Sequence, residues 1–76
     1  MAAEQDGDAK IQIRLGHIYD DGEGVGEDPG EAAKWYRMAA EQGVGEAQIK
    51  LGYMYAEGRG VGEDFAEAMK WYRMAA

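Results

Sequence analysis

The chain lacks the residue types on which many small active sites depend. Among its 76 residues there is no cysteine, which excludes disulfides, thiol nucleophiles and thiolate metal sites. A chain without thiols tolerates both oxidising and reducing surroundings, so its cysteine content does not indicate a cellular compartment. Serine and threonine are also absent, so hydroxyl nucleophiles are excluded. A chain this short buries about three-fifths of its surface, which gives a thin core and no deep catalytic cavity. We therefore expect no enzymatic activity.

Basic residues and long apolar runs are scarce. Eight Lys and Arg stand against fifteen Asp and Glu, for a formal net charge of −7. This charge repels polyanions, so we expect binding neither to nucleic acid nor to an anionic membrane surface. No apolar run approaches about 18 residues, and no basic segment followed by an apolar one opens the chain. The sequence thus shows no membrane span or signal peptide, and it leaves the localisation undetermined.

Metal ligands are scarce as well. His17 is the single histidine, and no cysteine or second histidine completes a zinc set. Carboxylates do gather between residues 20 and 31, but glycines occupy the places where a calcium loop supplies ligands. The glycine spacing at 22–26 does not match a dinucleotide-binding turn either. We predict no metal and no cofactor.

What the sequence does have is an internal repeat. Shifting the chain by 36 residues aligns 7–40 with 43–76, and 21 of the 34 aligned pairs are identical. The block K-W-Y-R-M-A-A occurs at 34–40 and again at 70–76. Such self-similarity is typical of helical repeat proteins, in which each unit needs a neighbour to bury its apolar face.

Each unit has the pattern of two helices. In the first helix of unit one, apolar and small residues recur at helical spacing and predict a buried stripe, formed by Ile11, Leu15, Ile18, Tyr19 and Gly22. In the second helix, the stripe is Ala32, Trp35, Tyr36 and Ala39. Aspartates are predicted to cap helix starts, and glycines are predicted to end helices and form turns. The expected helices span about 8–21, 29–42, 45–57 and 65–76.

These residues resemble the Sel1-like repeat, a relative of the tetratricopeptide repeat. The string L-G-x-x-Y-x-x-G-x-G-V-x-x-D is present from Leu15 to Asp28, and its continuation A-x-x-W-Y-x-x-A-A-E-Q-G runs from Ala32 to Gly43. It recurs from Leu51 to Ala76. The resemblance implies an all-α fold, a right-handed α-solenoid of two antiparallel helix-turn-helix repeats of 36 residues. It also implies a non-catalytic adaptor that holds other proteins.

The same pattern sets the expected organisation. We predict one solenoid domain over 1–76, with 1–6 the stub of a preceding repeat, 7–42 repeat one and 43–76 a truncated repeat two. Ile11 replaces the small alanine found at Ala47, so looser packing is expected around the first helix.

A stripe on the two first helices is the candidate partner-binding surface. In related solenoids these helices line the concave face. The stripe comprises Lys10, Arg14, His17 and Asp21 in unit one and Glu46, Lys50, Tyr53 and Glu57 in unit two. It offers basic, aromatic and titratable groups to a protein or peptide. The alternative is an ordinary solvated helix face. Two repeats provide less area than a standard interface, so binding through this face alone should be weak.

The ends of the solenoid are a second candidate surface. Neither end has the polar cap that closes most repeat arrays. Trp71, Met74 and Ala75 are therefore expected to form an exposed apolar end that joins copies of the chain into a homo-oligomer, head-to-tail or as a closed dimer. The functional prediction is a non-catalytic protein-interaction module that self-associates. The alternative is an engineered or truncated repeat scaffold with a structural or assembly role and no natural ligand.

Overall fold

The computed structural model describes residues 8–76, which form four helices: α1 (Ala9–Asp21), α2 (Pro29–Glu41), α3 (Gly45–Glu57) and α4 (Phe65–Ala75). No strand occurs among these residues. The predicted helix bounds are confirmed to within about one residue. The stub predicted at 1–6 lies outside the described residues.

Local hydrogen bonds fix where the helices start and end. The side chains of Asp8, Asp28 and Asp64 each accept a hydrogen bond from a backbone N–H in the first turn of α1, α2 and α4. Val44 precedes α3 without such a cap, as expected from its apolar side chain. Gly22 and Gly58 take positive φ angles of 75° and 67° at the ends of α1 and α3, a conformation that favours glycine. The helix ends are thus encoded locally.

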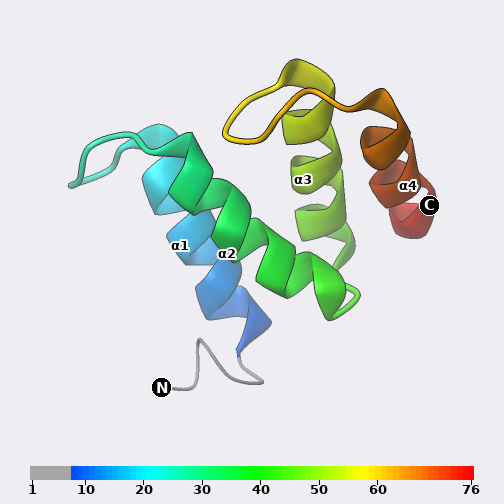
Figure 1. The fold of residues 1–76 in the computed structure, drawn as a ribbon. Coiled ribbons are helices and arrows are strands. Elements are labelled where there is room, and N and C mark those ends of the chain that lie inside the picture. Colours follow the sequence, from blue (N-terminus) through cyan, green and yellow to red (C-terminus); the bar gives the residue numbers. More distant parts are fainter. Residues whose placement is uncertain (1–7) are drawn as a thin grey trace.

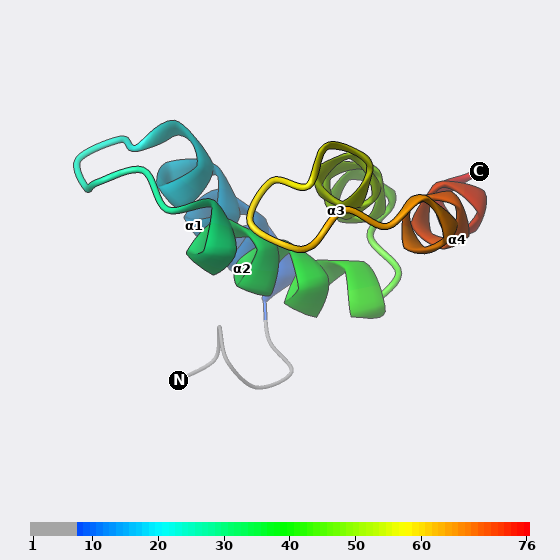
Figure 2. The ribbon, with the colours of Figure 1, turned by 45° about the horizontal axis from the view of Figure 1, so that its top comes forward.

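Consecutive helices pack against each other in chain order. α1 packs on α2, α2 on α3 and α3 on α4, so the chain is a short α-solenoid of two antiparallel helix pairs (Figures 1 and 2). The turns at 22–28 and 58–64 lie at the same end of the two pairs (Figure 1).

The core lies where α2 is covered by α1 on one side and by α3 on the other. Tyr36 and Leu51 are fully buried. Around them are alanines that bring the helices close together, among them Ala32, Ala39, Ala40 and Ala47, each 0% exposed. Burying a side chain as large as Leu51 contributes about 1.5–3 kcal/mol relative to leaving it in water. The Trp35 and Trp71 rings are also buried.

The stripe predicted for the first helix is partly wrong. Ile11 is 44% exposed, and the fully buried positions of α1 are Gln12 and Gly16. The physical reason is the missing neighbour: α3 lies against α2 of the preceding repeat, whereas within residues 8–76 no helix covers the same side of α1. Ala47, at the position equivalent to Ile11, is therefore 0% exposed.

The junction between the repeats has its own contacts. The Gln48 side-chain amide donates to the Ala40 carbonyl, 3.1 Å away, near the end of α2. The turn after α3 lies against the start of α2, where a Cβ on Gly60 would overlap the Pro29 carbonyl. These contacts hold α3 in a fixed position beside the first repeat.

Candidate functional site

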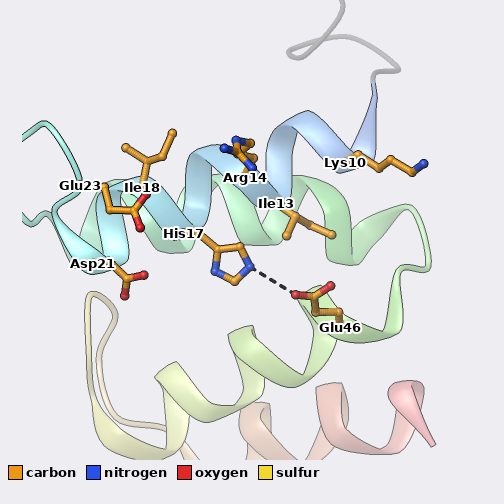
Figure 3. Close-up of a pocket in the computed structure, with 8 residues that line it drawn as sticks. All are labelled: Lys10, Ile13, Arg14, His17, Ile18, Asp21, Glu23 and Glu46. Atoms are coloured by element: carbon orange, nitrogen blue, oxygen red, sulfur yellow. Dashed lines mark hydrogen bonds and ion pairs between the residues drawn. The ribbon is translucent and has the colours of Figure 1, made fainter.

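A groove of about 580 Å³ runs along the exposed side of α1 and is bounded by the start of α3 (Figure 3). We call it the α1 groove. Five of its residues belong to the predicted stripe, and three do not. Its lining is Lys10, Ile13, Arg14, His17, Ile18, Asp21, Glu23 and Glu46. Figure 3 shows Ile13 and Ile18 on either side of the row of charged residues.

His17 links the groove to both repeats. Its Nε2 lies 3.2 Å from Glu46 Oε2 on α3, and its Nδ1 lies 3.0 Å from the Tyr36 hydroxyl on α2. An ionised Glu46 only accepts, so Nε2 donates to it. The Tyr36 hydroxyl has one proton to donate and contacts both His17 Nδ1 and Asp20 Oδ2. The ring is thus oriented from both sides.

The network continues into the second repeat through Asp20. The Tyr36 hydroxyl lies 3.4 Å from Asp20 Oδ2, and Arg59 Nε donates to Asp20 Oδ1 over 3.1 Å. Arg59 Nη2 also donates to the Asp20 carbonyl at 3.0 Å and lies 3.4 Å from Glu27. The contact between Tyr36 and Asp20 joins α2 to α1 within the first repeat. The contacts of Arg59 with Asp20 and Glu27 cross the junction between the repeats. Asp20, next to the groove residue Asp21, is therefore bonded to the turn after α3.

Two ionisation equilibria are affected by this network. Burial, and then the nearby Asp20 carboxylate, raise the pKa of Tyr36 well above its ordinary value, so this hydroxyl stays protonated at neutral pH. The hydrogen bond to Asp20 raises the pKa of Arg59, which keeps the guanidinium charged.

The other predicted stripe residues do not join the α1 groove. Tyr53 and Glu57 line a second groove of about 570 Å³, together with Pro29 and residues 58–60. Tyr53 is 52% exposed. The predicted eight-residue surface is therefore divided between two grooves, and Lys50 lies outside both.

Sequence reasoning missed Ile13, Ile18 and Glu23 as groove residues. Ile18 was missed because it was assigned to the buried stripe, and Ile13 was missed because it belongs to neither the buried stripe nor the polar stripe. Glu23 was missed because it lies in a turn, although it carries a visible signal: its equivalent in the second repeat is Arg59, of opposite charge.

The predicted self-association end needs correction. Trp71 is only 4% exposed and Ala75 is half-buried, so neither forms an open apolar face, whereas Met74 is 54% exposed. Trp71 occupies the position in the second helix pair that Trp35 occupies in the first, and both rings are buried. The exposed apolar residues along one side of α4, which we call the α4 end face, are Phe65 (63% exposed), Met69 (54%) and Tyr72 (38%).

Among residues 8–76, no group of three or more His, Asp or Glu side chains is arranged to hold a metal ion. Over the same residues, no helix is both long and apolar enough to cross a bilayer.

Two helix pairs with the same turn, stacked side by side and sharing buried positions such as Trp35 and Trp71, define a helical-repeat solenoid protein. The Sel1 repeat profile matches residues 9–44 and 45–76. The chain belongs to the Sel1 repeat family, whose repeats generally serve as protein-interaction scaffolds.

Three solved structures are similar to this chain. A Sel1 repeat protein from Oxalobacter formigenes has 43% identity and a TM-score of 0.87, over 90% of this chain and 28% of that one. The protein c5321, a protective antigen present in uropathogenic Escherichia coli strains, has 46% identity and a TM-score of 0.87, over 88% and 14%. The Helicobacter pylori cysteine rich protein B has 28% identity and a TM-score of 0.85, over 88% and 50%.

The chain thus spans half or less of the length of these three proteins. Comparison with curated proteins gives no match.

Proposed function

We propose that the chain is a non-catalytic protein-interaction module that binds a segment of a partner protein in the α1 groove. The observation that carries this proposal is the convergence of charged side chains from α1 and α3 with two partly exposed isoleucines in one groove. A binding site typically combines apolar contact area with a few placed polar groups. The groove volume also falls within the usual range for such sites.

The floor of the groove supports the same proposal because it is held in place before any partner arrives. His17 is bonded on both ring nitrogens, and its partner Tyr36 is fully buried. A preorganised surface loses less conformational entropy on binding. The contact area is nevertheless smaller than the ~800 Å² per partner of a standard interface, so we expect weak affinity for a single segment.

Selection from an unbiased peptide library on the immobilised protein tests this function. Peptides enriched on the native chain should lose affinity for the Arg14→Ala variant, which removes a groove residue. The matched control is Lys50→Ala, because Lys50 occupies the equivalent position in the second repeat and lines neither groove. Failure to enrich any peptide, or equal binding to both variants, contradicts the proposal.

We further propose that two copies of the chain associate through the α4 end face. Met69 and Tyr72 stand at the positions that Ala33 and Tyr36 occupy on α2, where they are 3% and 0% exposed. In the first repeat this side of the helix pair is covered by α3. The α4 end face is therefore an exposed apolar surface, and the equivalent surface of α2 in the first repeat is buried against α3.

The side chains favour a closed dimer over a head-to-tail chain of copies. Head-to-tail stacking that reproduces the internal junction would place Met69 where Ala33 lies and Ile11 where Ala47 lies. Both alanines are buried in that junction, so the two larger side chains would overpack it at a cost of about 1–3 kcal/mol. A two-fold dimer brings the same face of each copy together and avoids this overlap.

Sedimentation equilibrium up to millimolar concentration tests the association. We expect Met69→Glu to abolish it and Met74→Glu to leave it intact. Met69 and Met74 are equally exposed, at 54%, but lie about 140° apart around the helix. A native chain that stays monomeric over this range refutes the association, and loss in the Met74→Glu variant alone refutes the face.

A further inference from the structure

The charged residues that α1 and the turn after it contribute to the α1 groove are sorted by sign. Lys10 and Arg14 lie in the N-terminal half of α1, and Asp21 and Glu23 lie at its C-terminal end (Figure 3). Glu46 of α3 also lines the groove and is paired with His17. The four residues from α1 and its turn are all exposed. Within residues 8–76, none of these four side chains takes part in an ion pair or a hydrogen bond. The groove therefore presents free positive charge at one end and free negative charge at the other.

The helix itself adds to this separation. α2, α3 and α4 each carry a glutamate in the first turn, where it offsets the positive end of the helix dipole. α1 has no acidic residue in its first turn and no basic residue in its last. Lys10 instead stands near the positive end and Asp21 near the negative end. At the C-terminal end, the dipole and the side chains thus act in the same direction. At the N-terminal end, the Asp8 cap offsets part of the positive potential to which Lys10 adds.

The spacing of these charges matches an extended chain. Arg14 and Asp21 are seven residues apart on α1, and Lys10 and Asp21 eleven, which correspond to about 10 and 16 Å along the helix axis. Two side chains four residues apart on an extended segment are separated by about 13–14 Å and point to the same face. The side chain midway between them also points to this face. It would lie near His17, between Ile13 and Ile18.

We propose that the α1 groove takes an extended partner segment that carries an acidic and a basic side chain four residues apart, with an apolar side chain midway. The acidic side chain pairs with Lys10 and Arg14, the basic one with Asp21 and Glu23, and the apolar one contacts the isoleucines. This specificity rests on the proposed function of the groove. The acidic side chain can come before or after the basic one in the sequence of the segment. The charges alone decide which end of the segment lies at Lys10 and Arg14.

Titration with three blocked peptides, followed by NMR chemical shifts of the protein, tests this specificity. The mixed peptide contains Glu-Thr-Leu-Thr-Lys, and the two controls replace its charged residues by two glutamates or by two lysines. We expect the mixed peptide to bind about fivefold more tightly than either control at low salt, since each exposed ion pair contributes modestly. The shifts should map to the residues of the α1 groove, and the difference should shrink in about 0.5 M salt.

Changing the charge at one end of the groove should change the preferred peptide. With Lys10→Glu and Arg14→Glu together, the groove becomes acidic throughout and should prefer the two-lysine peptide. With Asp21→Lys and Glu23→Lys together, it should prefer the two-glutamate peptide. Lys50→Glu is the matched control and should leave the order of affinities unchanged. All these positions are at least partly exposed, and circular dichroism verifies that each variant is folded.

The outcomes separate this inference from the proposed function. Equal affinity for the three peptides, or a preference that does not follow the charge changes, overturns the charge order but leaves peptide binding in the groove intact. No binding of any of the three also overturns the inference. In that case the library selection decides the proposed function by itself, through enrichment that depends on Arg14.

Discussion

Gly16→Ala should destabilise the protein, although alanine is the better helix former. A Cβ at Gly16 would lie 2.6 Å from Tyr36 Cε1 and 2.7 Å from Cδ1. Tyr36 is 0% exposed, and its hydroxyl is bonded to His17, so the ring has no free space to move into. The chain offers a matched control at the equivalent position of the second repeat, Gly52.

The two substitutions differ in what the new methyl group meets. At Gly52 the Cβ would lie 3.0 Å from the ring of Tyr72, which is 38% exposed and can turn toward solvent, and 3.2 Å from the Ala68 carbonyl oxygen in α4. Replacing glycine by alanine within a helix gains about 1 kcal/mol at either site. Overpacking against a fixed ring costs about 2–3 kcal/mol. We therefore expect Gly16→Ala to lose about 1–2 kcal/mol of unfolding free energy and Gly52→Ala to lose clearly less.

Urea and thermal unfolding followed by circular dichroism measure this difference. The loss at Gly16 should lower Tm by about 4–8 °C per kcal/mol in a chain of this size. In a Tyr36→Leu background the clash is absent, so Gly16→Ala should no longer destabilise. The clash with Tyr36 is contradicted if Gly16→Ala is as stable as the native chain, if both alanine variants lose equally, or if the Tyr36→Leu background does not relieve the loss.

Three further variants and one control variant test the contacts around the junction and beside it. Arg59→Ala should lower the unfolding free energy by about 0.5–1 kcal/mol in low salt and by less in about 1 M salt, measured by urea unfolding. Gln48→Ala should cost about 1 kcal/mol in the same assay because it removes the side-chain hydrogen bond to the Ala40 carbonyl of α2, which then keeps only the backbone bond from Gly43 N–H. Since the folded-state pKa of Tyr36 is raised, the unfolded chain loses this proton first, and stability should fall as the pH rises above about 10. Tyr36→Phe should flatten this alkaline fall and Tyr72→Phe should not, in unfolding experiments between about pH 8 and 11.

Helix boundaries could be predicted because their signals are local in the chain. The Asp28 carboxylate accepts from the backbone N–H of Glu31, three residues away, and such a contact depends on few other parts of the fold. The positive φ of Gly22 likewise follows from the turn in which it lies. Four of the five stripe residues in the α1 groove were also predictable, because helical spacing places them on one side of α1. The fifth, Glu46, was predicted from the equivalent position on the first helix of the second repeat.

Burial and long-range networks could not be predicted in the same way. Leu15 and Leu51 occupy the same repeat position, yet only Leu51 is fully buried. The reason is that α3 packs against both α2 and α4, whereas within residues 8–76 α1 packs mainly against α2. Periodicity assigns both leucines the same environment, and the neighbouring helix decides which one is covered. The buried Gln48 was missed because its residue type predicts exposure, whereas its partner is a carbonyl eight residues away on another helix.

The ion pair at the junction also distinguishes two repeats that otherwise look interchangeable. Arg59 reaches back to Asp20 and Glu27 of the preceding repeat. The positions equivalent to these three residues in the other repeat are Glu23, Ala56 and Glu63. A tandem duplication that joined a second copy after α4 would therefore place Glu23 of that copy beside Ala56 and Glu63 of the first, where repulsion replaces attraction. The charged residues at the turns thus determine which repeat can follow the other. The apolar pattern that forms the helices is common to both repeats.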